Sequence, residues 1–157
     1  MARLIALAAA LALGGGAPAD DEKVSPDKLP AKVKEAVKAK YPRAEVTSAE
    51  LGDQDGTKVY ELGLKQGEKT WEASFTPEGK FVSAEEPVAS EADLPPKVKE
   101  TFRTKAPDAK VVKMEKETVG EGPDAKVVYE IVIEKGKDMV ELQFDPEGKL
   151  LGEEKKK

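Results

Sequence analysis

The residues with the clearest chemical potential are four glutamates that lie on two predicted β-hairpins. The dipeptides Gln66-Gly67 and Lys135-Gly136 are typical two-residue hairpin turns, in which glycine supplies the positive φ. Counting outward from these turns predicts two directly opposed pairs of carboxylates, Glu61 with Glu72 and Glu130 with Glu141. Like charges that face each other across a sheet destabilise it. An unfavourable pair that occurs twice suggests an acidic surface kept for binding.

The side chains predicted to surround these carboxylates on the same sheet face are Thr70, Ser74, Met139 and Gln143. We expect this acidic face to receive a basic peptide, a basic protein surface or a divalent cation. A second interpretation stays open, because glutamates on an exposed strand also keep a sheet soluble and block edge-to-edge association. Neighbouring lysines such as Lys58 or Lys69 would then neutralise them.

Catalysis is not expected, since the chain contains no cysteine and no histidine. Their absence excludes thiol nucleophiles, disulfides, the usual zinc sites and histidine-based proton transfer. Two carboxylates about 5 Å apart could serve a retaining glycosidase. An exposed flat sheet does not separate their pKa values, however, and Trp71 is predicted to face the core. We therefore expect no catalytic residue, no cofactor and no dedicated metal site.

The segment Asp53-Gln54-Asp55-Gly56 superficially resembles a calcium-binding loop. Such a loop needs glycine at its sixth position and a bidentate glutamate at its twelfth, whereas these positions here are Lys58 and Leu64. We interpret the segment as a tight hairpin turn.

The net charge limits the classes of partner that can be expected, and the N-terminal sequence indicates the cellular compartment. The formal net charge is −5, whereas nucleic-acid binding needs a basic footprint, so no nucleic-acid partner is expected.

Arg3 precedes an apolar run from Leu4 to Leu13, and Ala17-Pro18-Ala19 is an A-x-A sequence. Ten apolar residues are too few to span a bilayer. We expect a signal peptide cleaved after Ala19, a periplasmic or secreted protein, and no transmembrane span after cleavage.

An internal repeat sets the predicted architecture. Residues 29–46 match residues 94–111 at ten of 18 positions, and residues 60–80 match residues 129–149 at nine of 21. Roughly one or two matches per window would arise by chance. A four-residue insertion around Gly120-Glu121-Gly122-Pro123 distinguishes the second copy. The sequence therefore predicts two copies of one unit.

Each copy is predicted to begin with a helix and to continue as strands. Proline lies near the start of both helices, at Pro30 and Pro95, and again just past their ends, at Pro42 and Pro107. The strands alternate apolar and polar residues. They are expected near residues 44–46, 60–64 and 71–75 and from Phe81 in the first copy, and near residues 109–111, 127–133 and 140–144 and from Leu150 in the second.

Each unit is thus expected to be one helix against a four-stranded antiparallel meander. A unit of about 65 residues is marginal alone. We therefore expect an α+β fold in which both units join edge to edge into one eight-stranded sheet, with both helices on its apolar face. The predicted boundaries are a signal peptide over residues 1–19, a flexible segment over 20–24, a first repeat over 25–89, a second repeat over 90–152 and a charged tail over 153–157.

Several short patterns carry a resemblance to a known family. They are Leu29-Pro30 with Val33, Tyr41-Pro42 with Ala44 and Val46, Tyr60-Glu61, and Phe75 with Pro77 and Gly79-Lys80. This set resembles the PepSY-like, β-lactamase-inhibitor-like family of exported bacterial proteins, over both copies. Ala106 stands where the first copy has Tyr41. The resemblance implies a fold like that of the β-lactamase inhibitory protein, which binds its target with the concave face of its sheet, and it implies no catalytic residues.

Taken together, these features predict an exported, non-enzymatic protein that docks a partner on its open sheet face. The expected partner is a protein or a basic peptide of the cell envelope. The resemblance implies a first alternative, an inhibitor or chaperone of a secreted peptidase or another envelope enzyme. A second alternative is divalent-cation binding or envelope-stress sensing.

Overall fold

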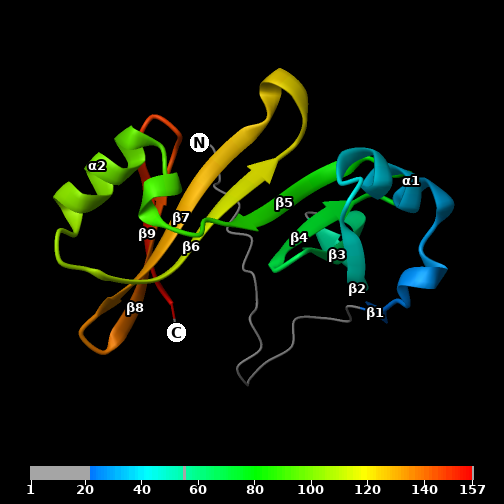
Figure 1. Ribbon diagram of the computed structural model, residues 1–157, viewed down its shortest axis with the longest axis horizontal. Helices are drawn as coiled ribbons and strands as arrows, with labels where there is room; N and C mark the ends of the chain where they lie inside the picture. The colour runs from blue at the N-terminus through cyan, green and yellow to red at the C-terminus, as the bar shows by residue number, and fades with distance from the viewer. Residues whose placement is uncertain (1–21, 55, 157) are drawn as a thin grey trace.

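The structure is a computed structural model that describes residues 22–54 and 56–156. Its centre is one antiparallel sheet of nine strands, in which each strand pairs with its neighbours along the chain (Figure 1). The strands are β1 (Glu22–Lys23), β2 (Glu45–Gln54), β3 (Thr57–Gln66), β4 (Lys69–Phe75), β5 (Phe81–Pro87), β6 (Lys110–Val119), β7 (Lys126–Lys135), β8 (Asp138–Phe144) and β9 (Leu150–Lys156). The predicted signal peptide and its cleavage site lie outside the described residues.

Two α-helices interrupt the strands, α1 (Ala31–Lys40) and α2 (Pro96–Lys105), and short 3-10 turns precede both. Pro30 and Pro95 immediately precede the two helices as N-caps, which confirms the predicted helix starts to within one residue. Tyr41 and Ala106 end them, since each residue comes before a proline and is therefore pushed out of the helical region. Both helices bury apolar residues one turn apart. These are Val33 and Val37 in α1, and Val98 and Phe102 in α2.

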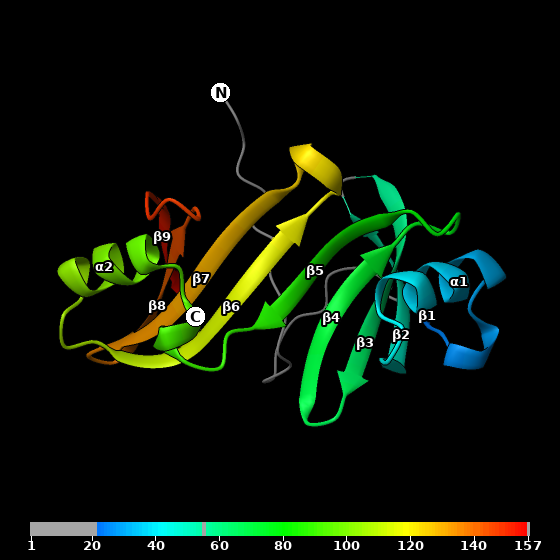
Figure 2. The same cartoon turned by 45° about the horizontal axis from the view of Figure 1, so that its top comes forward.

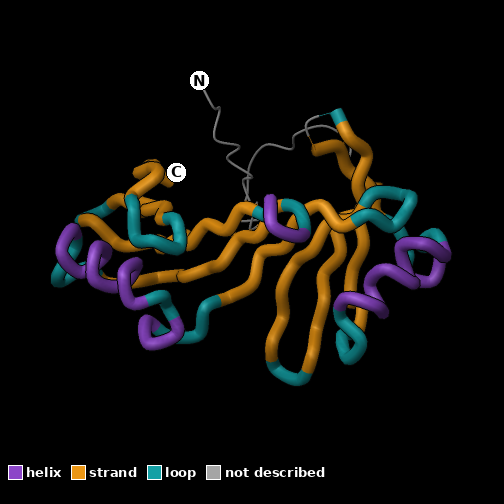
Figure 3. Tube along the Cα trace, turned by 90° about the horizontal axis from the view of Figure 1, so that it is seen from above, coloured by secondary structure: helices purple, strands orange, loops and turns teal. Residues whose placement is uncertain are grey.

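The two helices cover the same face of the sheet, towards its opposite ends (Figure 3). Each packs on its own half of the sheet, so the structure has two cores. Leu62, Ala73 and Phe75 pack with α1 in the first core. Ile131, Leu142 and Phe144 pack with α2 in the second. Trp71 lies in the first core, as predicted, and its ring packs edge-on against Tyr41 with centroids 5.4 Å apart.

The two halves meet where β5 pairs with β6, and we call this pairing the seam. Figure 2 shows β5 and β6 side by side in the middle of the sheet. The seam aligns Ala84 with Thr118 on the helix-covered face and Glu85 with Glu117 on the other face. The chain between these strands runs through α2, so no short turn defines how they pair.

The sheet extends beyond the predicted strands at both ends. It has nine strands rather than eight because Glu22 and Lys23, in the segment expected to be flexible, pair with Leu51 and Glu50 of β2. At the other end, β9 continues to Lys156, so residues 153–156 belong to the sheet and not to a tail. The physical reason is that this segment completes the ladder with β8 as far as Met139, and Lys156 forms an ion pair with Glu141.

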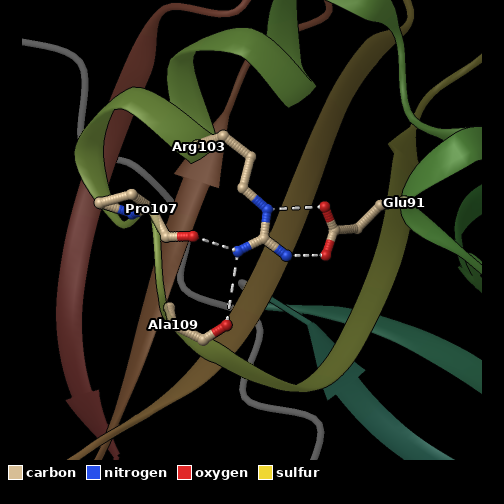
Figure 4. Close-up of polar contacts among 4 residues, drawn as sticks. All are labelled: Glu91, Arg103, Pro107 and Ala109. Atoms are coloured by element: carbon tan, nitrogen blue, oxygen red, sulfur yellow. Dashed lines mark hydrogen bonds and ion pairs between the residues drawn. The ribbon is translucent and has the colours of Figure 1, made fainter.

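Arg103, near the end of α2, forms hydrogen bonds with the segments that precede and follow this helix (Figure 4). Its Nε and Nη2 atoms donate to the two carboxylate oxygens of Glu91, and its Nη1 donates to the backbone oxygen of Pro107 at 3.0 Å. A bidentate pair of this kind fixes direction as well as distance. The corresponding positions of the first copy, offset by 65 residues, are Pro26 and Lys38, which cannot form this contact.

One turn glycine lies in close contact with each helix, Gly79 with α1 and Gly148 with α2. Gly79 lies in the turn between β4 and β5, has φ of +84°, and lies so close to α1 that a Cβ atom would come within 2.5 Å of the Lys32 backbone oxygen. Gly148 occupies the equivalent turn under α2, with φ of +82°. Glycine is required here for two reasons, a left-handed backbone and the absence of space.

We expect Gly79→Ala to destabilise the protein by about 2–4 kcal/mol, because it combines a left-handed alanine with a clash against helix backbone. The control is Gly67→Ala. Gly67 also has a positive φ, of +63°, but a Cβ there would meet nothing within 4 Å. It should cost only about 1 kcal/mol. Urea unfolding of both variants measures the difference, and equal losses would show that the helix contact contributes nothing.

Candidate binding face of the sheet

The two hairpins that carry the predicted carboxylate pairs have a register shifted from the one expected. In the first, Gly67 and Glu68 form the turn, so Gln66 pairs with Lys69. In the second, Lys135 pairs with Asp138 around Gly136. Glycine occupies the first of the two turn positions, and the order Gly-X is as compatible with a two-residue hairpin as the X-Gly assumed from the sequence.

The predicted face-to-face pairs are therefore wrong. Glu61 lies opposite Ser74, with Glu72 diagonal to it, and Glu130 lies opposite Gln143, with Glu141 diagonal to it. The shift moves the pairing by two positions, which preserves the alternation of side chains between faces. All eight predicted site residues consequently lie on the face opposite α1 and α2, which we call the open face. They are Glu61, Thr70, Glu72, Ser74, Glu130, Met139, Glu141 and Gln143.

The open face carries many more carboxylates than these four. Following the register from strand to strand, at least one glutamate of each strand from β2 to β9 lies on this face. We call the set the acidic row: Glu50, Glu61, Glu72, Glu85, Glu115, Glu117, Glu130, Glu141 and Glu154. The row crosses the seam without interruption.

Many members of the acidic row stand directly opposite one another. Glu85 is flanked on both sides, by Glu72 of β4 and by Glu117 of β6. Three further opposed pairs are Glu50 with Glu61, Glu115 with Glu130, and Glu141 with Glu154. Each directly opposed like-charge pair costs about 0.2–1 kcal/mol. The arrangement is electrostatically unfavourable wherever the groups are ionised.

Polar neighbours relieve part of this repulsion at several members of the row. Lys156 Nζ lies 2.7 Å from Glu141 Oε2, and Lys113 Nζ lies 2.7 Å from Glu115 Oε2. The amide nitrogen of Gln143 donates to Glu130 and to Glu141, at 3.0 Å in both cases. In the first half of the sheet, the amide nitrogen of Gln54 similarly donates a hydrogen bond to Glu61 at 3.2 Å.

The opposed pair at the seam, Glu85 with Glu117, lacks such relief. Glu85 and Glu117 are only 9% and 7% exposed, and neither carboxylate has a hydrogen bond or an ion pair within the described part of the chain. Burial, followed by the carboxylates of Glu115 and Glu130, raises the pKa of Glu85 to about 8. Burial is also the main cause that raises the pKa of Glu117 and that brings the pKa of Glu130 to about 7. Burial thus disfavours the charged form of all three groups, and at Glu85 and Glu117 no neighbouring cation or hydrogen-bond donor offsets it.

The structure gives no support to a metal centre or a calcium loop. Within residues 22–54 and 56–156, no group of three or more carboxylates converges closely enough to hold a metal ion. Asp53 instead accepts a hydrogen bond from the backbone nitrogen of Gly56 at 2.7 Å, which is the side-chain-to-backbone bond of an ordinary turn. The hairpin interpretation of this segment is confirmed.

Sequence reasoning missed the two glutamates at the centre, Glu85 and Glu117. Their placement on one face follows from alternation along β5 and β6. Their proximity follows only from the seam, which has no turn to predict it. A partial signal was present in Glu115 and Glu117, two carboxylates spaced for one face of a strand.

The raised pKa values predict that the protein loses stability as pH rises. The folded protein keeps a proton on Glu85 up to about pH 8, whereas the group has an ordinary value of 4.5. Between these values the folded state binds more protons than the unfolded state, so the free energy of unfolding falls with rising pH and levels off above about pH 8. Thermal unfolding followed between pH 5 and pH 9 measures this slope.

In the same experiment, Glu85→Gln should flatten the slope. It should raise the free energy of unfolding at pH 9 by about 1–2 kcal/mol, after allowance for partial solvation, and change little at pH 5. Glu100→Gln, an exposed change on α2, serves as the control of equal charge and should leave the slope as it is. A Glu85→Gln variant that follows the native pH profile would show that this carboxyl ionises normally.

Comparison with known proteins supports the fold and identifies the family. Solved structures that resemble the chain include a BLIP-like protein from Bacteroides fragilis NCTC 9343, with TM-score 0.62 and 23% identity over 80% of this chain and 86% of the other. A DUF2874 family protein from Bacteroides ovatus ATCC 8483 has TM-score 0.64 and 20% identity over 82% and 89%. A protein from Bacteroides eggerthii DSM 20697, described as a putative periplasmic protein, has TM-score 0.65 and 19% identity over 80% and 88%.

The comparison with curated proteins gives no match. In the described part of the chain, no helix has the length and apolar character needed to cross a membrane. The family model described as "Putative beta-lactamase-inhibitor-like, PepSY-like" matches residues 19–83 and again residues 59–152. These two matches together cover most of the sequence and both halves of the sheet, and the chain therefore belongs to the PepSY-like, β-lactamase-inhibitor-like family.

Proposed function

We propose that this is an exported, non-enzymatic binding protein that docks a basic protein or peptide on the open face of its sheet. The observation that carries the proposal is the acidic row, and above all its centre, where Glu85 and Glu117 are buried without a cationic partner. Buried carboxylates of this kind reduce stability when they ionise. Residues that cost stability without serving the core are typical of functional sites.

A basic partner would reverse this cost. Ammonium or guanidinium groups placed over the acidic row would favour the ionised carboxylates and remove the repulsion between opposed pairs. The gain would be largest at Glu85 and Glu117, since Glu141 and Glu115 already have Lys156 and Lys113. Docking on this face also leaves both helices and both cores unchanged, which suits a rigid binding surface.

The export part of the proposal rests on the N-terminal sequence and on the periplasmic description of the Bacteroides eggerthii protein. The similarity to a BLIP-like protein supports the fold on which this proposal depends. If the partner is a secreted peptidase or another envelope enzyme, the protein would act as its inhibitor or chaperone by the same docking. A divalent-cation role gains no support from the spacing of the carboxylates in residues 22–54 and 56–156.

The test is affinity capture from an envelope extract with the chain from Asp20 onward, beside a variant with Glu85, Glu117 and Glu130 changed to glutamine. We expect the native protein to retain a basic partner, the variant to lose it, and the retained partner to elute as salt rises above about 0.3 M. Any captured enzyme should be assayed with and without the protein, which distinguishes an inhibitor from a passive binder.

The matched control changes three exposed glutamates elsewhere, Glu35, Glu78 and Glu100, to glutamine, so that the net charge is the same in both variants. Capture by this control but not by the first variant would place docking on the open face. Equal capture by all three proteins would contradict the proposed face. No capture by any of them would contradict a stable protein partner.

A further inference from the structure

A pocket of about 380 Å³ opens at one end of the seam, beside the acidic row. It lies among the β2–β3 turn, the β4–β5 turn and the ends of β5 and β6. Its wall includes Phe81, Val82 and Val119, and its polar lining includes Ser83 and Glu117. The volume lies within the range of about 300–1,000 Å³ that is usual for ligand sites, so the pocket can accept a side chain or a small ligand.

The pocket combines mainly apolar walls with carboxylates at one side. Most of its surface is apolar, while Glu117 is a residue of only 7% exposure whose carboxylate has no hydrogen-bond or ion-pair partner in the described part of the chain. Glu85, directly opposite Glu117 across the seam, adds a second carboxylate. A ligand that fits must therefore combine a cationic head with an apolar stem.

Among protein side chains, arginine meets these requirements best. Its guanidinium is planar, donates two parallel hydrogen bonds to a carboxylate, and is less strongly hydrated than an ammonium group, so it enters partly buried sites more readily. Its methylene stem packs on apolar walls while the head stays paired. Arginine is also one of the residues that most often anchor protein interfaces in pockets.

We infer that the seam pocket is an anchor for one arginine side chain of the partner, with its guanidinium on Glu117 and its stem against Val82 and Val119. This inference rests on the proposed function, because it supplies the specific contact within a broader electrostatic docking. Lys80, which also lines the pocket and is exposed, opposes the cation and tunes its affinity.

The experiment uses two probes. The first is the capped tripeptide acetyl-Ala-Arg-Ala-amide, which reports on the pocket. The second is a lysine decamer, which reports on docking along the acidic row. Binding is measured by NMR titration of the protein, and the tripeptide is expected to bind in the millimolar range, as suits one anchored side chain, and to shift the amide signals of Val82, Val119 and Gly120.

Variants then assign the contact. Glu117→Gln should weaken tripeptide binding about tenfold or more, because it removes the carboxylate that pairs with the guanidinium. Lys80→Ser should strengthen it about twofold, because it removes a repulsive charge near the pocket. Glu100→Gln, the same charge change at an exposed position of α2, should leave it unchanged. A citrulline tripeptide, neutral and of the same shape, should not bind.

The outcomes separate the anchor from the proposed function. Tripeptide binding that survives Glu117→Gln or the citrulline exchange would overturn the anchor, as would no tripeptide binding at all. Decamer binding in either case would leave docking on the open face intact. A third tripeptide, acetyl-Ala-Lys-Ala-amide, compares lysine with arginine, and equal affinity for it would overturn the assignment to arginine. Failure of both probes to bind would overturn the proposed function together with the inference.

Discussion

The pairing of β5 with β6 is the interaction on which the rest of the structure depends. Each half of the chain has one helix on four long strands, and a unit of that size buries too little apolar surface to be secure alone. The seam joins the two halves of the sheet edge to edge, which removes one exposed strand edge from each half. It also brings Glu85 against Glu117, so the pairing that joins the two halves also places two buried carboxylates opposite each other.

The elements and the faces could be predicted from the sequence, because alternation and proline positions are local signals. The prediction that Trp71 faces the core is confirmed, and so is the placement of Glu61 and Glu130 on the face opposite it. The hairpin register could not be predicted from the sequence in the same way, since Gln66-Gly67 and Gly67-Glu68 are both acceptable two-residue turns. The seam was beyond local reasoning, because the connection through α2 leaves many possible alignments of β5 and β6. The centre of the candidate site depends on that alignment, which is why Glu85 and Glu117 were missed.

The two interpretations of the glutamates that the sequence left open apply to different parts of the acidic row. Glu72 and Glu154 are exposed, as expected of residues that keep a sheet soluble. Glu85 and Glu117 are buried and therefore contribute little to solubility. A solvated face explains the periphery of the row but not its centre, where burial raises the pKa values. The binding interpretation is consequently concentrated at the seam.

The pairing of Tyr41 with Trp71 has a practical consequence, because Trp71 is the sole tryptophan of the chain and lies in the first core. Its fluorescence reports on the N-terminal half alone, whereas circular dichroism reports on the backbone of both halves. Coincidence of the two signals during denaturation indicates all-or-none unfolding. A separation between them would reveal a half-folded intermediate, and with it the strength with which the seam couples one half to the other.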